Sequence, residues 1–457
     1  MTRRLAEALA ACRWEDIPRE AIGEAQWAVL DWLGSALAGA TEPPARMMQR
    51  VAARMGTSVE ATVFGAGRSS AAVAALANGV ASHILELDDV HRGSTLHAGA
   101  AVIPAALAVA EREHADGRGF LLAVVVGYEA ATRIGEAVNP THYRFWHPTG
   151  TAGTFGAATA TCSLLKLNAA RMLDALGTAG TQAAGLWEFN ADGAMSKPLH
   201  PGKAAFNGIL AADLAREGFT GATRILEGER GFFRAMSAAC DPTRITDGLG
   251  QRWKIRENCY KLHSCCAHTH TAVDTALGLR AQARWPGAEA AKRVREIWIE
   301  TYRTGFEIVK EPNPQSAYQA QFSIAYCVAV ALAEGKVGLE QFTPERFGPG
   351  GVADPAIAAL VGRTRVSVED DLTAKYPGAW PARVSVTLDD GTVLRGAADY
   401  PRGNPENPVP TAALEEKFLA LVAPKLGPDA AQRALRAIRE LEARKDMAEA
   451  FGGLFPG

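Results

Sequence analysis

The sequence predicts a mainly α protein, with a large all-helical domain built from both chain ends and a smaller α+β domain inserted between them. Three observations predict this arrangement. The first half is dominated by alanine-rich stretches with helical periodicity, the region after residue 256 alternates apolar and polar residues like strands, and the tail returns to helix. We therefore expect a helical domain over residues 1–256 and 409–457 and a lid domain over residues 257–408. A chain of 457 residues is also too long for one simple core.

Seven segments of the first half have the spacing of amphipathic helices. In the first of them, Ile17, Ile22, Ala25, Val29 and Leu33 form an apolar stripe. Alanine and glycine recur on the side expected to be buried, and small side chains let helix backbones approach closely, so we expect a helical bundle. The seven segments are residues 17–39, 70–87, 99–113, 119–137, 150–165, 170–184 and 203–216.

The inserted region mixes strands and helices. Val294–Tyr302 alternates apolar and polar residues like a half-buried strand. Residues 383–388 and 392–397 flank Asp389-Asp390-Gly391, which is typical of a hairpin turn. We expect a further strand at Thr364–Glu369, a helix over residues 320–334, a proline-rich linker over Pro401–Pro410 and a helical tail over Thr411–Ala450.

Composition excludes several classes of function. A formal net charge of −2 gives no electrostatic reason to expect nucleic acid or an anionic membrane as a partner. No window approaches the roughly 20 apolar residues of a membrane span. Seven cysteines without a regular framework are typical of reduced thiols. We expect a cytoplasmic protein whose partner is a small molecule.

All ten histidines lie between positions 83 and 270, and they direct attention to four segments. The first, Glu86–Gly99, holds Asp88, Asp89 and His97 in a predicted loop between helices, where catalytic groups usually lie. The alternative is a capped helix junction, with Asp88 or Asp89 ending one helix and Ser94 or Thr95 capping the next.

The second and third segments each precede a predicted helix. In Trp146–Gly153, Thr149 can cap a glycine-rich helix whose N-terminus favours an anion, next to His147. A capped core helix would explain this segment equally well. In Met195–Ala205, Lys197 and Lys203 flank His200 and could bind a carboxylate, unless both lysines are simply exposed.

The fourth segment, Tyr260–His270, offers a rival metal site. Cys266 and His270 are four residues apart and would share one helix face, as zinc ligands could. No Cys-x-x-Cys recurs and no His-Glu-x-x-His is present, so we expect no metal. Phosphate-loop and nucleophile-elbow motifs are absent too, and Phe64–Arg68 is not followed by the pattern of a dinucleotide site.

These segments resemble the MmgE/PrpD family, which includes 2-methylcitrate dehydratase, cis-aconitate decarboxylase and iminodisuccinate epimerase. The resembling stretches occur in family order: Leu87 through His97, His147 through Thr151, Lys197 through Gly202, Lys261 through His270, and Gln321 through Tyr326. The resemblance implies a homodimer, no cofactor and an active site between the two domains. The chain departs from the family at Ala98, where proline commonly follows the loop histidine, and at His263-Ser264, where an aromatic residue and proline often stand.

The resemblance implies an enzyme that removes a proton next to a carboxylate of a small di- or tricarboxylate. We expect a lyase similar to 2-methylcitrate dehydratase, with an epimerase or a cis-aconitate decarboxylase-like enzyme as alternatives. An inactive binding homologue and a zinc hydrolase are rival hypotheses. The matching catalytic positions are His97, Asp88, His147 and Tyr326, and the matching substrate-binding positions are Asp89, Lys197, His200, Lys261 and His270.

Histidine titrates near neutral pH, so we nominate His97 as the base and His147 as the second choice. Tyr326 or Asp88 would protonate the leaving group. Lys197 and Lys261 would bind substrate carboxylates and stabilise the charge that develops beside them.

Overall fold

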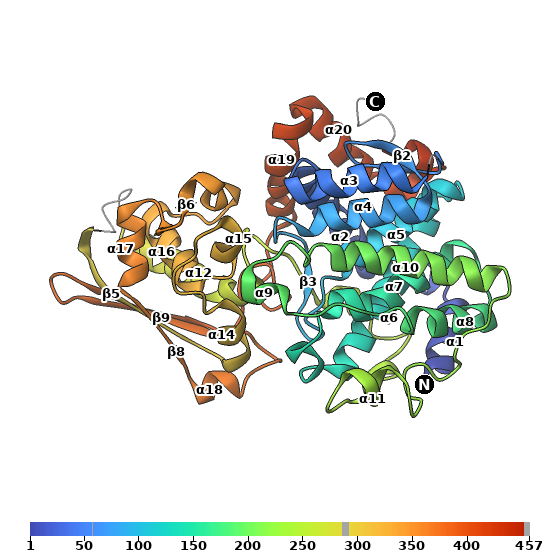
Figure 1. The fold of residues 1–457 in the computed structure, drawn as a ribbon, viewed down its shortest axis with the longest axis horizontal. Helices are drawn as coiled ribbons and strands as arrows, with labels where there is room; N and C mark the ends of the chain where they lie inside the picture. Colours follow the sequence, from blue (N-terminus) through green and yellow to red (C-terminus); the bar gives the residue numbers. More distant parts are fainter. Residues whose placement is uncertain (57, 286–291, 452–457) are drawn as a thin grey trace. The chain divides into compact units, whose positions relative to one another are not determined.

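The computed structural model describes residues 1–56, 58–285 and 292–451. Helices dominate and the sheets are small, which confirms the prediction of a mainly α fold. The chain divides into two compact units, coloured along the sequence in Figure 1. Unit 1 comprises residues 1–84, 88–259 and 410–457, and unit 2 comprises residues 85–87 and 260–409. None of the helices in the described ranges combines the length and apolarity needed to span a bilayer.

Unit 1 is a helical bundle. Its central helix, α7, packs against α5, α6, α8 and α10, and α4 packs against α2, α5 and α10. Two short antiparallel strand pairs accompany the helices: β1 (Ala61–Val63) with β2 (Gly67–Ser69), and β3 (Val90–His91) with β4 (Asn258–Cys259). The main helices are α1 (Thr2–Ala11), α2 (Arg19–Gly39), α3 (Pro43–Met55), α4 (Ala71–His83), α5 (Ala98–Arg112), α6 (Gly117–Val138), α7 (Pro148–Leu164), α8 (Ala169–Gly180), α10 (Leu199–Arg216), α19 (Thr411–Leu426) and α20 (Pro428–Arg439).

Glycines allow the central helices to touch. A Cβ atom built on Gly127 of α6 would lie 2.5 Å from Cγ1 of Val102, and one built on Gly156 of α7 would lie 2.6 Å from Cβ of Ala131. These distances are far below van der Waals contact, so a methyl group at either position would force the helices apart. At the start of α7, a Cβ atom on Gly150 would lie 2.5 Å from the carbonyl oxygen of Ala184. The close packing expected from the small residues is therefore present.

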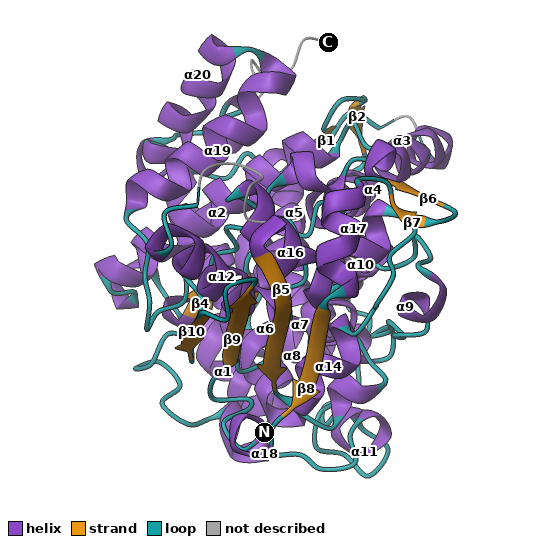
Figure 2. Ribbon diagram, turned by 90° about the vertical axis from the view of Figure 1, so that its left-hand side faces the viewer, coloured by secondary structure: helices purple, strands orange, loops and turns teal. Residues whose placement is uncertain are grey.

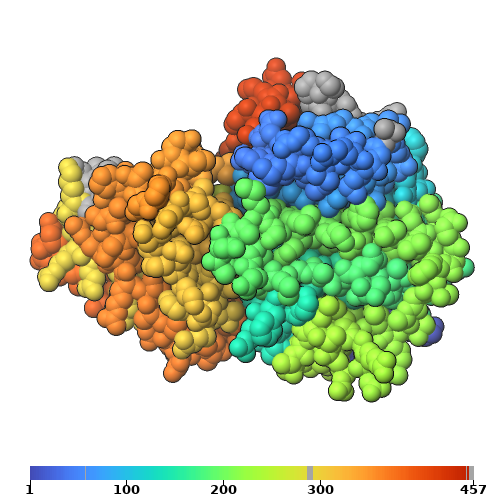
Figure 3. All heavy atoms as spheres, viewed as in Figure 1, coloured from blue at the N-terminus to red at the C-terminus, as the bar shows by residue number. Residues whose placement is uncertain are grey.

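Helix α3, on the outside of unit 1, is mostly exposed. Only Ala45 and Ala52 of α3 are buried, and this N-terminal segment, blue in Figure 3, lies on the surface of the unit. Helix α10, green in the same view, also reaches the surface, but most of its residues are buried against α4, α7 and α8.

Several helix boundaries differ from the sequence-based expectations. The helix expected over residues 70–87 ends at His83, and Glu86 takes a left-handed backbone conformation with φ of 53°. The helix expected over residues 320–334 is broken into α15 (Ala317–Gln321) and α16 (Ile324–Glu334), because the Ser323 side chain caps the second one. The tail breaks at Gly427, which has φ of 82°.

Unit 2 is built around a four-stranded sheet in the order β10-β9-β5-β8, drawn in orange in Figure 2. Strand β5 (Val294–Thr301) runs parallel to β8 (Thr364–Val368) and antiparallel to β9 (Ala382–Leu388). Strands β9 and β10 (Val393–Ala398) form the expected hairpin. Helix α12 (His270–Gln282) packs on β9, β10 and α16, and α16 packs on α17 (Pro355–Gly362).

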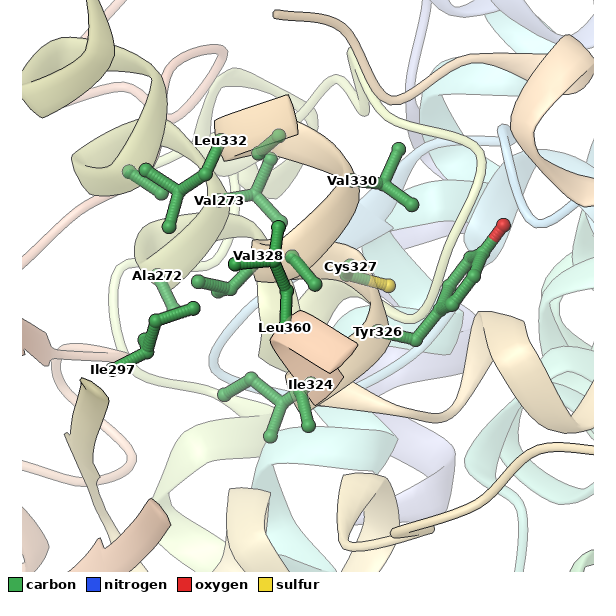
Figure 4. Close-up of a cluster of buried hydrophobic side chains, with 14 of the residues drawn as sticks. Ala272, Val273, Ile297, Ile324, Tyr326, Cys327, Val328, Val330, Leu332 and Leu360 are labelled. Atoms are coloured by element: carbon green, nitrogen blue, oxygen red, sulfur yellow. The ribbon is translucent and has the colours of Figure 1, made fainter. Parts of the chain in front are cut away.

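The core of unit 2 lies between its sheet and these helices (Figure 4). Ile297 and Ile299 of β5 are paired in register with Val386 and Val384 of β9, and all four side chains are buried. Because strand side chains alternate between faces, these residues share the face that the helices cover.

Candidate active site

The ends of four helices in unit 1 bring polar groups together. His83 is the last residue of α4, and Asp88 and Asp89 lie in the turn that follows. His97 and His147 are the residues immediately before α5 and α7, and His200 lies in the first turn of α10. Helix α10 packs against α4, α5 and α7, and α5 packs against α4 and α7, so the bundle fixes where these residues meet. Four of the predicted residues, Asp88, His97, His147 and His200, therefore come together, with His83 added to them.

Asp88 joins two imidazoles. Its Oδ2 atom lies 2.7 Å from Nδ1 of His83 and 3.3 Å from Nδ1 of His97. Burial alone would raise the pKa of Asp88, but the charges and hydrogen bonds of His83 and His97 outweigh it and hold that pKa well below its usual range. Asp88 is therefore an ionised acceptor, and it does not suit the predicted role of proton donor.

His97 is held in one tautomer. Its Nδ1 lies 2.8 Å from the carbonyl oxygen of Asp89, and a carbonyl can only accept, so Nδ1 carries the proton. Its backbone N–H donates to Oγ1 of Thr149, which shows that the expected capping of the α7 helix by Thr149 is wrong. In this tautomer the lone pair of the imidazole lies on Nε2, as a general base requires.

His147 and His200 form a second imidazole pair, with their Nδ1 atoms 3.1 Å apart. Burial, followed by the charges of neighbouring histidines and of Lys197, lowers the pKa of His147 well below its usual value. Burial, His83 and Lys197 together lower the pKa of His200 to about 4. Both rings are therefore neutral at physiological pH. Lys197 itself is 2% exposed, whereas Lys203 is exposed and donates to Asn207, so the two lysines of this segment are not equivalent.

Asp89 has the opposite electrostatic character from its neighbour. Burial and the negative charge of Asp31 raise the pKa of Asp89 to about 7, although the hydrogen bond from Tyr128 and the nearby amide of Asn258 partly oppose this shift. The Tyr128 hydroxyl donates to Oδ2 at 2.8 Å and the Gly99 N–H donates to Oδ1 at 3.1 Å. Adjacent carboxyl groups thus differ, one ionised and one partly protonated at neutral pH, which is a common arrangement in acid–base sites.

Two groups of side chains in the described ranges have the ligand types and spacing of a metal site. One is His83, His97 and His147, whose ligand atoms lie within 4.8 Å of one another. The ammonium group of Lys197 acts on His83 and His147 as a nearby positive charge and would oppose a divalent cation there. In the other, His91, Glu136 and Glu257, the carboxylates already bind an ammonium, because Nζ of Lys254 lies 2.8 Å from Glu136 and 3.4 Å from Glu257. We assign no metal to either group.

The remaining predicted residues lie in unit 2. Lys261 and Glu86 form a buried ion pair with Nζ and Oε2 3.4 Å apart. His270 donates to the carbonyl oxygen of Cys265 from Nε2, and its ring packs edge-on against His263. Cys266 precedes a short 3-10 helix and His270 begins α12, so they do not share a helix face as the zinc hypothesis required. Neither residue belongs to a metal-like group in the part of the chain described.

Tyr326 is part of the unit 2 core. It is fully buried, its ring packs against Phe342 and Phe347, and its hydroxyl donates to the carbonyl oxygen of Gln341. In Figure 4 that hydroxyl points away from the aliphatic side chains of the cluster. Burial also raises the pKa of this phenol, so Tyr326 is a poor proton donor.

Sequence reasoning missed His83 and the Tyr128–Asp31 surroundings of Asp89. His83 lies five residues before Asp88, inside a segment that reads as an ordinary alanine-rich helix. The only signal was a lone histidine at the end of that helix. Tyr128 and Asp31 lie within long apolar helices, and only the packing of α2, α5 and α6 brings them to Asp89.

The chain resembles known proteins over almost its whole length. Residues 3–244 match the model of the MmgE/PrpD N-terminal domain, and residues 263–443 match that of the MmgE/PrpD C-terminal domain. A cis-aconitate decarboxylase-like protein of Aspergillus oryzae is 28% identical over 96% of this chain and 95% of its own. The cis-aconitate decarboxylases of Aspergillus terreus and Homo sapiens are each 28% identical, over 90% and 92% of this chain and 88% and 87% of theirs.

Proposed function

The chain belongs to the MmgE/PrpD family, and from this premise we propose that it is a cofactor-independent lyase acting on a small di- or tricarboxylate. The observation that carries the proposal is the buried group of imidazoles around ionised Asp88. Breaking a bond next to a carboxylate requires proton transfer at carbon, and preorganised histidines supply it at neutral pH.

In this proposal, His97 is the base and its Nε2 lone pair accepts the substrate proton. The Asp89 carbonyl accepts from its Nδ1–H, and the Asp88 carboxylate beside it stabilises the imidazolium that forms. Asp89, with a pKa near 7, replaces Asp88 and Tyr326 as the side-chain acid. Lys197 and the neutral His147–His200 pair would bind substrate carboxylates and stabilise charge on the carbon.

The relatives favour decarboxylation within this class. Their names describe cis-aconitate decarboxylases, and the similarity covers about nine-tenths of the chain. In such a reaction a carbon–carbon bond breaks, CO₂ leaves, and the electron pair is taken up by one proton from an enzyme acid. Dehydration of a 2-methylcitrate-like hydroxy acid is the second candidate: one carbon-bound proton is removed and hydroxide leaves as water. A homodimer, a lid formed by residues 257–408 and a cytoplasmic location remain parts of the proposal.

One NMR screen tests the proposal. The purified protein is incubated in D₂O with cis-aconitate, citrate, 2-methylcitrate, iminodisuccinate and hydroxysuccinate in turn. We expect CO₂ release from cis-aconitate with deuterium in the product, or dehydration of 2-methylcitrate. Deuterium exchange or inversion without net elimination would instead identify an epimerase. If no compound reacts or exchanges a proton, the protein is not an enzyme of this class and the binding-homologue hypothesis replaces ours.

A further inference from the structure

One ring nitrogen of His83 makes a hydrogen bond, and the other has no hydrogen-bond partner among the described residues. Its Nδ1 lies 2.7 Å from Asp88, which is ionised and can only accept, so Nδ1 carries the proton and Nε2 is the bare lone pair. That Nε2 atom is buried and has no hydrogen-bond partner among the described residues. Leaving a buried polar atom unpaired costs about 1–3 kcal/mol, and proteins rarely do so without a reason.

The unpaired nitrogen belongs to a ring that lies among the proposed catalytic groups. The His83 ring centroid lies 4.7 Å from that of His97, with the rings edge to face, and 5.5 Å from that of His147, with the rings stacked. His83 is 1% exposed and is held by the end of α4, so its ring has little freedom to turn elsewhere. A group that belonged only to the core would be expected to have both nitrogens satisfied, as His142 does with Met236 and Thr151.

The charges around Asp88 allow one extra proton. A single carboxylate contacts both His83 and His97, so it compensates one imidazolium and not two. Lys197 and the other histidine oppose a second positive charge on His83, in addition to the cost of burial. The unit of His83, Asp88 and His97 can therefore take up one extra proton, on the Nε2 atom of one imidazole, with Asp88 ionised throughout.

We propose that His83 is a second catalytic residue, whose Nε2 atom contacts the substrate and exchanges a proton with it as the partner of His97. This inference rests on the proposed function. In an elimination, one imidazole takes the carbon-bound proton at its bare Nε2 and leaves the electron pair on carbon, the hydroxide leaves as water with the proton of Asp89, and exchange with solvent returns both groups to their starting states. In a decarboxylation, an imidazole that has taken up the one extra proton gives it to the carbon that gains the electron pair as CO₂ leaves, and a proton from water replaces it.

The substitution His83→Asn separates contact with substrate from mere support of Asp88. An asparagine amide can replace the Nδ1–H donor to Asp88 but has no atom at the position of Nε2. We expect kcat on the substrate found in the screen to fall at least about a hundredfold in His83→Asn, within the usual range of acid–base catalysis. His83→Ala should fall as far or further, and His142→Asn should lose much less. Thermal melting of each variant checks folding.

The outcomes are distinct. If wild type reacts and His83→Asn keeps its kcat within about threefold while His83→Ala loses it, His83 only positions Asp88 and the inference is overturned, although the proposed function stands. If wild type reacts with no compound in the screen, the proposed function and the inference fall together.

A spectroscopic readout on wild type avoids the risk that the variant fails to fold. The ¹⁵N signals of labelled histidines report which nitrogen carries a proton. We expect His83 to show Nδ1–H and a bare Nε2, and its Nε2 signal to move when propane-1,2,3-tricarboxylate, which has no leaving group, is added. The His142 signals should stay in place. A His83 Nε2 signal unchanged at saturating ligand would overturn the contact with substrate.

Discussion

The polar groups around the predicted site residues of unit 1 and of unit 2 differ in how they are partnered. In unit 2, Lys261 is paired with Glu86, His263 with Asp274, and the Tyr326 hydroxyl with Gln341. In unit 1, Nε2 of His83 and Oδ1 of Asp88 are buried without a hydrogen-bond partner among the described residues. Since unpaired buried polar atoms are costly, the first arrangement is what a stable fold needs and the second is what a ligand site needs. The same residue types can thus be structural in one unit and functional in the other.

The largest effect is expected for the base. His97→Asn keeps a donor toward the Asp89 carbonyl and removes Nε2, so we expect kcat to fall at least about a hundredfold with little loss of stability. Steady-state kinetics on the substrate identified by NMR, with thermal melting as a control, measures this. Near-normal turnover would promote His147 to the role of base and make His97 a structural residue like those of unit 2.

Lys261 should behave in the opposite way, as a stability residue. Lys261→Met removes the ammonium group that lies 3.4 Å from the buried carboxylate of Glu86, and breaking a buried ion pair costs about 3–5 kcal/mol. Adding Glu86→Gln removes that charge and should restore much of the loss. Denaturant unfolding of both variants tests this. If Lys261→Met unfolds like wild type but loses substrate affinity, Lys261 is a binding residue as the sequence predicted.

Lys197 and Lys203 offer a matched pair within unit 1. Lys197 is buried beside the imidazoles, whereas Lys203 is exposed. Losing a charged hydrogen bond to substrate, worth about 1.5–3 kcal/mol, should lower kcat/KM about tenfold to a hundredfold in Lys197→Met, with KM raised and kcat reduced together. Lys203→Met should change either constant less than about threefold. Equal small effects would mean that substrate carboxylates are held elsewhere, for example by Arg92 or Arg144.

We expect a smaller effect on the pH dependence of the activity. If Asp89 must be protonated, activity should fall as the pH rises through its pKa of about 7. The groups that face Asp89 are Asp31, Asp88, Tyr128 and Asn258. The Tyr128 hydroxyl stabilises the ionised carboxylate, so Tyr128→Phe should raise the pKa of Asp89 and move the alkaline limb of the kcat profile to higher pH. If the alkaline limb of the kcat profile stays at the same pH in Tyr128→Phe, a group other than Asp89 causes it.

We expect chelation of metal ions to leave the activity unchanged, the smallest effect of the series. Lys197 places a positive charge beside the three imidazoles, which disfavours a divalent ion. Exhaustive chelation followed by metal analysis and an activity assay checks this. Stoichiometric zinc or iron, with activity lost on its removal and regained on its return, would contradict the metal-free proposal.

The mainly α fold could be predicted because periodic helices and the strand hairpin are local features of the sequence. The site could be predicted only in part. Asp88, His97, His147 and Lys197 stand in polar loops that attract attention, whereas His83 and Tyr128 sit in apolar helices and join the site only through packing. The roles of the two aspartates could not be predicted, because adjacent carboxyl groups look alike until their surroundings are known. Asp88 faces imidazoles and Asp89 faces another carboxylate.

The glycine contacts that join α6 to α5 and α7 limit which substitutions the protein can accumulate over generations. A single methyl group added at Gly127 or Gly156 would meet neighbouring atoms at about 2.5 Å. These two positions therefore tolerate only glycine. The turn that carries Asp88 and His97 is buried as well, so a new side chain there must fit the space between helix ends that cannot move apart. Gene duplicates that inherit the bundle could therefore diverge toward new acids only through side chains that keep to this space.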